Sequence, residues 1–129
     1  MEKKIVVLAA VFGLTAIILG AFGAHALKKV LSPDSLTSFE TGVKYQFYHA
    51  LFLLFISQTT FLSLKEKEII FWLTLSGVIF FSCSIYLLTT QSITNLKLKF
   101  LGPITPIGGF LLIGAWAYFL TKTISKNIG

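Results

Sequence analysis

Four long stretches with almost no charged side chains place the strongest limit on what this chain can fold into. They cover residues 5–26, 47–64, 69–90 and 101–120, and each is about 18 to 22 residues long. A helix that crosses the hydrocarbon core of a bilayer needs about 20 mostly apolar residues. We therefore predict an all-α integral membrane protein, built as an antiparallel bundle of four transmembrane helices.

Composition and length support the same class. Hydrophobic residues make up 55% of the 129 residues and charged residues 12%, with a mean hydropathy of +0.84, whereas soluble domains carry about 25% charged residues. At about 20 residues for each span, this length excludes a sizeable extramembrane domain. We expect a single domain over residues 1–129, with helices at residues 5–26, 38–64, 69–90 and 103–121.

The connections between these helices are expected to differ. The charged run at residues 65–68 predicts a tight turn between the second and third helices, which would leave that end of the bundle structurally plain. Residues 32–35, Ser-Pro-Asp-Ser, indicate a turn or the start of a short interfacial helix, with proline suited to the first helical position. Thr37 stands three residues before Glu40, the spacing of a capping box. The second helix is therefore expected to begin near residue 38, well before its apolar part.

Lysines supply the positive charge of the chain. There are eleven lysines, no arginines and five acidic residues, which gives a net charge of +6. In a four-span arrangement, six lysines fall on the side of the termini and four or five on the other side. This bias favours both termini in the cytoplasm. Because the lysines are scattered and no arginine fork is present, we predict no nucleic-acid partner and no bidentate phosphate site.

Polar residues gather near the predicted first and third loops, at the membrane face opposite the termini. Unpaired polar groups in hydrocarbon cost several kcal/mol each, so these side chains are expected to find partners in one cluster. We predict that this cluster is the ligand-binding site, if the protein has one. Its members are His25, Glu40, Lys44, Tyr45, Gln46, Tyr48, His49, Tyr86 and Thr105.

Several of these residues also have a simpler interpretation. His25 and His49 could ligate a haem or share a metal, but a single histidine on a helix is more often a hydrogen-bonding group near the interface. Glu40 and Lys44 have the i,i+4 spacing of an exposed helix pair. The sequence has no Ser-His-Asp pattern, Walker loop, HExxH motif or cysteine cluster. We therefore predict no enzymatic activity and no cofactor.

Small residues predict where the helices pack. On the first helix they recur at steps of three and four residues, which makes a ridge that a second helix can approach closely. His25 points nearly opposite this ridge if the helix is regular. We expect the third and fourth helices to meet near Gly77, Gly109 and Gly114. The ridge residues are Ala9, Gly13, Ala16, Gly20 and Gly23.

Four ordered motifs resemble a known family. GAFGAH at residues 20–25, TGVKYQFYHA at 41–50, FSCSIY at 81–86 and TPIGG at 105–109 are similar to the small membrane proteins of the bacterial YgdD and YwdK type, a domain-of-unknown-function family. The resemblance implies a four-helix protein of the bacterial inner membrane and transfers no biochemical activity. One departure is Cys83, where the family commonly has glycine, and this implies a looser backbone contact there.

Three hypotheses of function follow. The first is a non-enzymatic membrane protein that serves membrane integrity or binds lipid or a small ligand at the polar cluster. The second is an oligomeric small-solute or proton-linked transporter or channel. The third is an intramembrane haem or metal protein that uses His25 and His49. The partners expected are membrane lipids, with a second copy of the chain as an open alternative.

Overall fold

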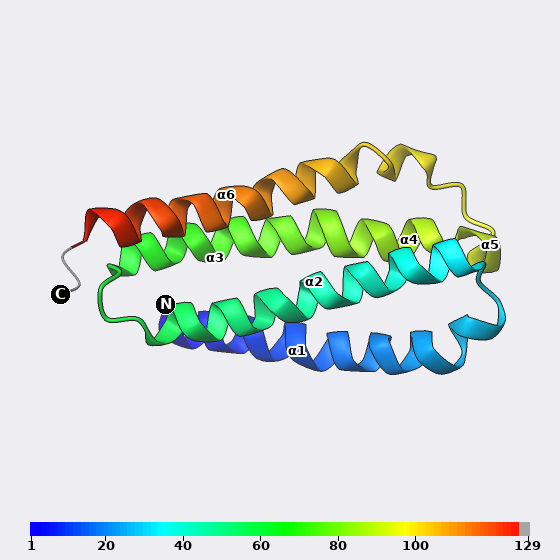
Figure 1. Cartoon of the computed structure of the whole chain (residues 1–129), viewed down its shortest axis with the longest axis horizontal. Helices are drawn as coiled ribbons and strands as arrows, with labels where there is room; N and C mark the ends of the chain where they lie inside the picture. The colour runs from blue at the N-terminus through cyan, green and yellow to red at the C-terminus, as the bar shows by residue number, and fades with distance from the viewer. Residues whose placement is uncertain (127–129) are drawn as a thin grey trace.

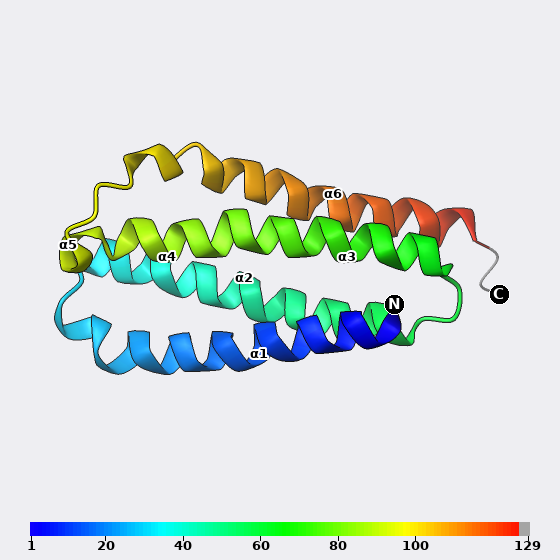
Figure 2. The same ribbon diagram turned by 180° about the vertical axis from the view of Figure 1, so that it is seen from behind.

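A computed structural model describes residues 1–126, and this part of the chain is helical with no β-strand. The helix α1 is followed by a short 3-10 turn, η1, and then by α2 (Figures 1 and 2). Next, α3, the π-helical segment η2 and α4 join end to end as one rod. Two short segments, α5 and η3, lead into α6. The bounds are α1 Glu2–His25, η1 Leu27–Lys29, α2 Pro33–Gln58, α3 Leu64–Val78, η2 Ile79–Cys83, α4 Ser84–Thr89, α5 Gln91–Thr94, η3 Lys99–Leu101 and α6 Ile104–Ser125.

Three segments are long and apolar enough to cross a membrane. They are Glu2–Lys29, Leu64–Thr89 and Lys99–Ser125. The sequence predicted four spans, and α2 does not reach the same hydropathy because it carries polar residues such as Lys44, Gln46 and His49 along its length. Figure 1 shows that α1 begins and α6 ends at the same end of the molecule, which we call the termini end. We call the opposite end the loop end.

The second helix begins earlier than expected. Ser32 is its N-cap, because the Ser32 hydroxyl accepts a hydrogen bond from the Ser35 amide at 3.2 Å, and Pro33 follows at the first helical position. The predicted start near residue 38 is wrong. Thr37 caps nothing, since its hydroxyl donates to the Pro33 carbonyl one turn earlier, at 2.9 Å.

The predicted turn at residues 65–68 is also wrong. The chain leaves α2 after Gln58 and turns over residues 59–63. Ser63 and Glu66 then form a capping box, in which the Ser63 hydroxyl accepts from the Glu66 amide at 3.1 Å and Glu66 accepts from the Ser63 amide at 2.9 Å. The box stabilises the first turn of α3, so the charged run lies on this helix instead of between helices.

The ridge of small residues on α1 packs against α2, as expected. Ala9, Ala16 and Gly23 are buried, and a Cβ atom at Gly23 would lie only 3.1 Å from the Phe39 ring. His25, on the opposite side of the helix, is exposed. Close packing of α1 on α2 therefore leaves His25 outside the core.

Two other glycines bring α6 against the rod formed by α3, η2 and α4. A Cβ atom at Gly108 would overlap the backbone of Phe81, and one at Gly77 would lie 2.6 Å from Leu112 Cδ2. Gly77 was predicted for this role, but Gly108 takes the place of Gly109. A Cβ atom at Gly114 would meet nothing within 4 Å. The contact at Gly108 is made by the π-helical segment, so α6 packs directly on the main chain of η2.

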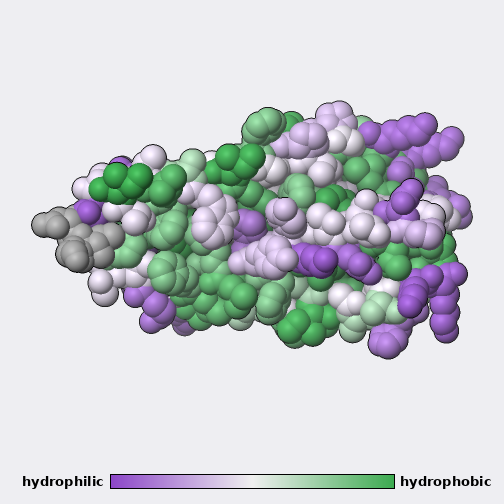
Figure 3. Space-filling model, viewed as in Figure 1, coloured by the Kyte–Doolittle hydropathy of each residue, from purple (hydrophilic) through white to green (hydrophobic). Residues whose placement is uncertain are grey.

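The rods do not form a closed bundle, because α2 and α6 are not packed main chain against main chain. Within residues 1–126, α6 approaches α3, η2, α4 and η3, while no Cα atom of α6 lies within 8 Å of a Cα atom of α1 or α2. The main chains of α2 and α6 are therefore separated by a gap that only side chains fill. Figure 3 shows apolar surface along the middle of the molecule and hydrophilic surface gathered at the loop end.

Candidate functional site

Gln46 joins three helices in the interior. Its side chain is 4% exposed, and its amide nitrogen donates to the Phe12 carbonyl at 2.9 Å and to the Thr15 hydroxyl at 2.6 Å. Its amide oxygen accepts a hydrogen bond from the Tyr86 hydroxyl at 2.7 Å. Both amide hydrogens and one oxygen lone pair are thus engaged. Gln46 connects α1, α2 and α4 and has no free N–H group to offer a ligand.

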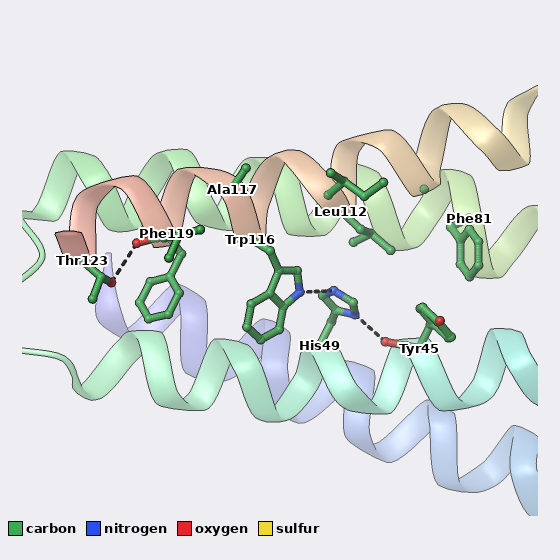
Figure 4. Close-up of a pocket in the computed structure, with 11 residues that line it drawn as sticks. Tyr45, His49, Phe81, Leu112, Trp116, Ala117, Phe119 and Thr123 are labelled. Atoms are coloured by element: carbon green, nitrogen blue, oxygen red, sulfur yellow. Dashed lines mark hydrogen bonds between the residues drawn. The ribbon is translucent and has the colours of Figure 1, made fainter. Parts of the chain in front are cut away.

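His49 bridges α2 and α6 (Figure 4). Its Nε2 atom lies 3.1 Å from the indole Nε1 of Trp116, and its Nδ1 atom lies 2.7 Å from the Tyr45 carbonyl oxygen. An indole nitrogen can only donate, so Nε2 is the acceptor and Nδ1 carries the proton. Both ring nitrogens of His49 are therefore occupied, and neither offers a lone pair to a metal.

Two further polar contacts lie closer to the loop end. The Ser84 hydroxyl lies 2.6 Å from the Thr105 hydroxyl, which links α4 to the start of α6. The Ser82 hydroxyl donates to the Gly42 carbonyl at 2.8 Å. These bonds satisfy buried hydroxyl groups with neighbours on adjacent helices, a common way to join helices inside a bilayer.

The nine residues predicted to cluster do not form one group. Gln46 contacts Tyr86, His49 contacts the Tyr45 main chain, and Thr105 contacts Ser84. The side chains that remain exposed are those of His25, Glu40, Lys44, Tyr45 and Tyr48.

The position of Gln46 along the bundle also differs from the prediction. Gln46 lies 13 residues after Pro33 and 12 before Gln58, so it is at the middle of α2 instead of at the loop end. The early start of α2 causes this shift, because five additional residues add about 7 Å of helix before it.

The two histidines are too far apart to share a ligand. Gln46 is level with Phe12, which is 13 residues from His25 along α1, or about 20 Å. His49 lies beyond Gln46, one turn further toward the termini end. The third hypothesis, in which both histidines bind one metal or haem, does not fit this geometry. Residues 1–126 hold no group of three or more His, Cys, Asp or Glu side chains suited to a metal ion.

A groove runs between α2 and α6, and we call it the α2–α6 groove. It encloses about 840 Å³ and extends from Tyr45 and Phe81 to Thr123. His49 and Trp116 meet within it (Figure 4). Its lining is almost entirely apolar, and Trp116 stacks on Phe52 with 4.1 Å between ring centroids. The lining residues are Tyr45, His49, Phe81, Gly109, Leu112, Ile113, Trp116, Ala117, Phe119, Leu120 and Thr123.

Sequence reasoning did not find this groove. Its residues on α6 belong to an apolar run that contains no polar signal. One pattern was available: His49 and Phe52 are three residues apart on α2, and Trp116 and Phe119 are three residues apart on α6. Such pairs face the same way on their helices and can meet across a gap.

Ionic contacts organise the termini end, which was expected to be structurally plain. Lys67 is 3% exposed, and its ammonium group lies 3.1 Å from the Glu2 carboxylate and 3.3 Å from the Ser57 carbonyl oxygen. Glu66 lies 3.0 Å from Lys126 and 3.8 Å from Lys122. The starts of α1 and α3 and the ends of α2 and α6 are therefore tied together.

Long apolar helices, interior polar groups that pair across helices, and charged groups held at the ends of the rods define an all-helical membrane protein. The chain belongs to the family described as protein of unknown function (DUF423), whose model matches residues 19–109. This confirms the resemblance found in the four sequence motifs.

Curated relatives carry the name UPF0382 membrane protein. The chain is 40% identical over 124 residues to one from Staphylococcus aureus (strain bovine RF122 / ET3-1), with 94% of this chain and 95% of the relative covered. It is 36% identical over 127 residues to YwdK of Bacillus subtilis (strain 168), covering 95% and 97%. It is 32% identical over 116 residues to one from Haemophilus influenzae, covering 90% of each. No solved structure matches the chain.

Proposed function

We propose that the protein is a non-enzymatic, four-pass protein of the bacterial inner membrane that binds a lipid acyl chain in the α2–α6 groove. The observation that carries this proposal is the groove itself, about 840 Å³ of apolar space along the side of two helices. This volume lies within the range of about 300 to 1,000 Å³ that is usual for small-molecule sites.

The proposal requires α2 to cross the membrane with the other three rods, as an antiparallel bundle. Its 26 residues span about 39 Å, longer than the hydrocarbon core of about 30 Å. Its polar residues Gln46 and His49 are buried and paired, while Leu51 and Phe55 are apolar and exposed. A helix of this kind can stand in hydrocarbon because its polar groups face its neighbours. The lysine bias then orients both termini toward the cytoplasm.

The groove has the length and position of an acyl chain. Along α6 it extends from Gly109 to Thr123, which is 14 residues or about 21 Å. Half of the hydrocarbon core is about 15 Å deep. The groove therefore begins near the termini end and passes the middle of the bilayer. Its wall residues Ile113, Trp116 and Leu120 are exposed, so a chain can enter sideways from the lipid phase.

The interior favours lipid binding over the transport hypothesis. The central polar groups Gln46 and His49 hydrogen-bond to protein partners instead of facing a water-filled path. No observation of comparable weight supports an oligomeric channel or a proton-linked transporter.

Tryptophan fluorescence tests the groove. A Trp72→Phe variant keeps Trp116 in the groove as its sole tryptophan, and a Trp116→Phe variant keeps Trp72, which is exposed on α3 outside it. Each purified protein is titrated in detergent with a phospholipid that is brominated on its acyl chain. We expect the quenching of Trp116 to reach saturation as the lipid fraction rises. Over the same range, the quenching of Trp72 should increase in proportion to the lipid fraction.

A groove-filling variant completes this experiment. Ala117→Phe in the Trp72→Phe background places a ring in the groove, so the saturable phase of Trp116 quenching should disappear while the thermal transition in detergent persists. Parallel, unsaturable quenching of Trp72 and Trp116 would contradict lipid binding in the α2–α6 groove.

A further inference from the structure

A second groove lies between α1 and α3, and we call it the α1–α3 groove. It encloses about 370 Å³ and has Phe71 of α3 on one side. Lys3, Val7 and Val11 follow at steps of four residues, so they share one face of α1. The groove therefore has a cationic end at the termini end of the molecule and an apolar remainder. Its lining residues are Lys3, Lys4, Val7, Leu8, Val11 and Phe71.

The two lysines at the end of this groove have no acidic partner in the described chain. Over residues 1–126, salt bridges join Lys67 to Glu2, and Lys122 and Lys126 to Glu66. Glu2 is the acid adjacent to Lys3 in the sequence, and its carboxylate is engaged by Lys67 at 3.1 Å. The positive charges of Lys3 and Lys4 are therefore left for an anion from outside the protein.

We propose that the α1–α3 groove binds one anionic phospholipid from the leaflet on the side of the termini. The phosphate group lies at Lys3 and Lys4, and one acyl chain follows Val7 and Val11 beside Phe71. The distance from Lys3 to Val11 is eight residues, or about 12 Å, close to the depth of one leaflet, about 15 Å. Juxtamembrane lysines attract anionic headgroups in this position.

This site is independent of the α2–α6 groove. The α2–α6 groove has no charged residue in its lining, so it has no means of choosing a headgroup by charge. The α1–α3 groove has two lysines, so it distinguishes an anionic lipid from a zwitterionic lipid with the same acyl chains. Headgroup selectivity is therefore the property that tests the second site alone.

Native mass spectrometry of the purified full chain measures this selectivity. The protein is incubated with equal amounts of phosphatidylglycerol and phosphatidylcholine that carry identical acyl chains. We expect preferential retention of one phosphatidylglycerol. Lys3→Gln with Lys4→Gln should reduce this preference by about fivefold for each lysine, or about 25-fold in all. Lys28→Gln with Lys29→Gln removes the same charge at the loop end and should leave the preference unchanged.

A second variant separates the groove from the charge. A chain with Trp72→Phe, Trp116→Phe and Val7→Trp has its sole tryptophan in the α1–α3 groove, and brominated phosphatidylglycerol should quench the fluorescence of that tryptophan. Adding Val11→Trp to this chain narrows the groove. This addition should lower the retention of phosphatidylglycerol in native mass spectrometry. Equal loss of selectivity in both pairs of lysine variants would overturn the proposal, since it would show a response to net charge alone. Displacement of the lipid by glycerol phosphate at equal concentration would also overturn it, because the site would then be one for a soluble anion.

Discussion

Gln46 shows how one side chain can set the position of three helices. An amide in hydrocarbon must satisfy both donor hydrogens and its oxygen, and the partners of Gln46 come from α1 and α4. The observed arrangement of these rods brings the Phe12 carbonyl, the Thr15 hydroxyl and the Tyr86 hydroxyl within reach together. The residue therefore specifies which parts of the helices lie side by side, in addition to any stability it contributes.

Replacing Gln46 tests this role. Gln46→Leu leaves the Tyr86 hydroxyl without its acceptor, while the Thr15 hydroxyl keeps its bond to the Val11 carbonyl. We expect a loss of about 1 to 3 kcal/mol in the free energy of unfolding. Tyr86→Phe alone should cost less, because it removes a donor but leaves the Gln46 bonds to α1. The double variant should cost less than the sum of the two. Thermal unfolding in detergent measures all three, and strictly additive losses would show that the two side chains do not interact.

Individual residues show where sequence reasoning succeeded and failed. Gln46 and His49 were recognised as polar groups that need partners, because a polar side chain in an apolar run is conspicuous. Trp116, the partner of His49, was not found, since a tryptophan in an apolar run looks like any core residue. The helix start at Ser32 and Pro33 was one of two alternatives for residues 32–35, and Thr37 was preferred as the cap of the second helix. The Ser63 cap was missed in favour of a charged turn, because several residues near each helix start satisfy the same capping pattern.

At the scale of elements, the contact between α6 and η2 depends on glycine at one position. A Cβ atom at Gly108 would overlap the main chain of Phe81, which cannot move aside as a flexible side chain can. The helices themselves were predictable from their apolar runs. The register between them was not, because a shift of one residue from Gly109 to Gly108 turns the contact by about 100° around the helix.

Two alanine substitutions on α6 should therefore have different effects. Gly108→Ala forces α6 away from η2, and we expect a loss of about 1 to 3 kcal/mol in unfolding free energy. Gly114→Ala meets no atom within 4 Å, so it should be neutral or stabilise the helix by up to about 1 kcal/mol. Thermal denaturation of both proteins in the same detergent makes the comparison. Equal destabilisation by the two substitutions would be inconsistent with the contact at Gly108.

For the whole molecule, the lack of close main-chain packing between α2 and α6 bears on the proposed function. Because α6 leans on α3 and η2 instead of on α1 or α2, the α2–α6 groove remains along the side of the protein. A sequence pattern predicts where the long apolar helices lie. It does not predict whether four rods close into a square bundle or stay open, since that choice depends on contacts such as Gly108 on Phe81.

Cysteine labelling tests the proposed four-pass topology. In a Cys83→Ser background, single cysteines at Lys4 and Lys126 should react with a membrane-impermeant maleimide only after the cells are permeabilised. Cysteines at Lys29 and Lys97, at the loop end, should react in intact cells. Opposite behaviour of Lys4 and Lys126 would rule out four passes. A reversal of both pairs would leave the topology intact and contradict the cytoplasmic location of the termini.

The contact between Lys67 and Glu2 has a consequence for the order of events during synthesis. Glu2 is made first, but its partner lies 65 residues later in the chain. At about 5 to 20 residues per second, the ribosome reaches Lys67 about 3 to 13 seconds after Glu2. Throughout that interval the Glu2 carboxylate has no Lys67 to pair with, although α1 can already pack against α2 once Gln58 has been made. The ion pair that fixes the beginning of this protein therefore forms only after α3 has begun to be made, about midway through synthesis.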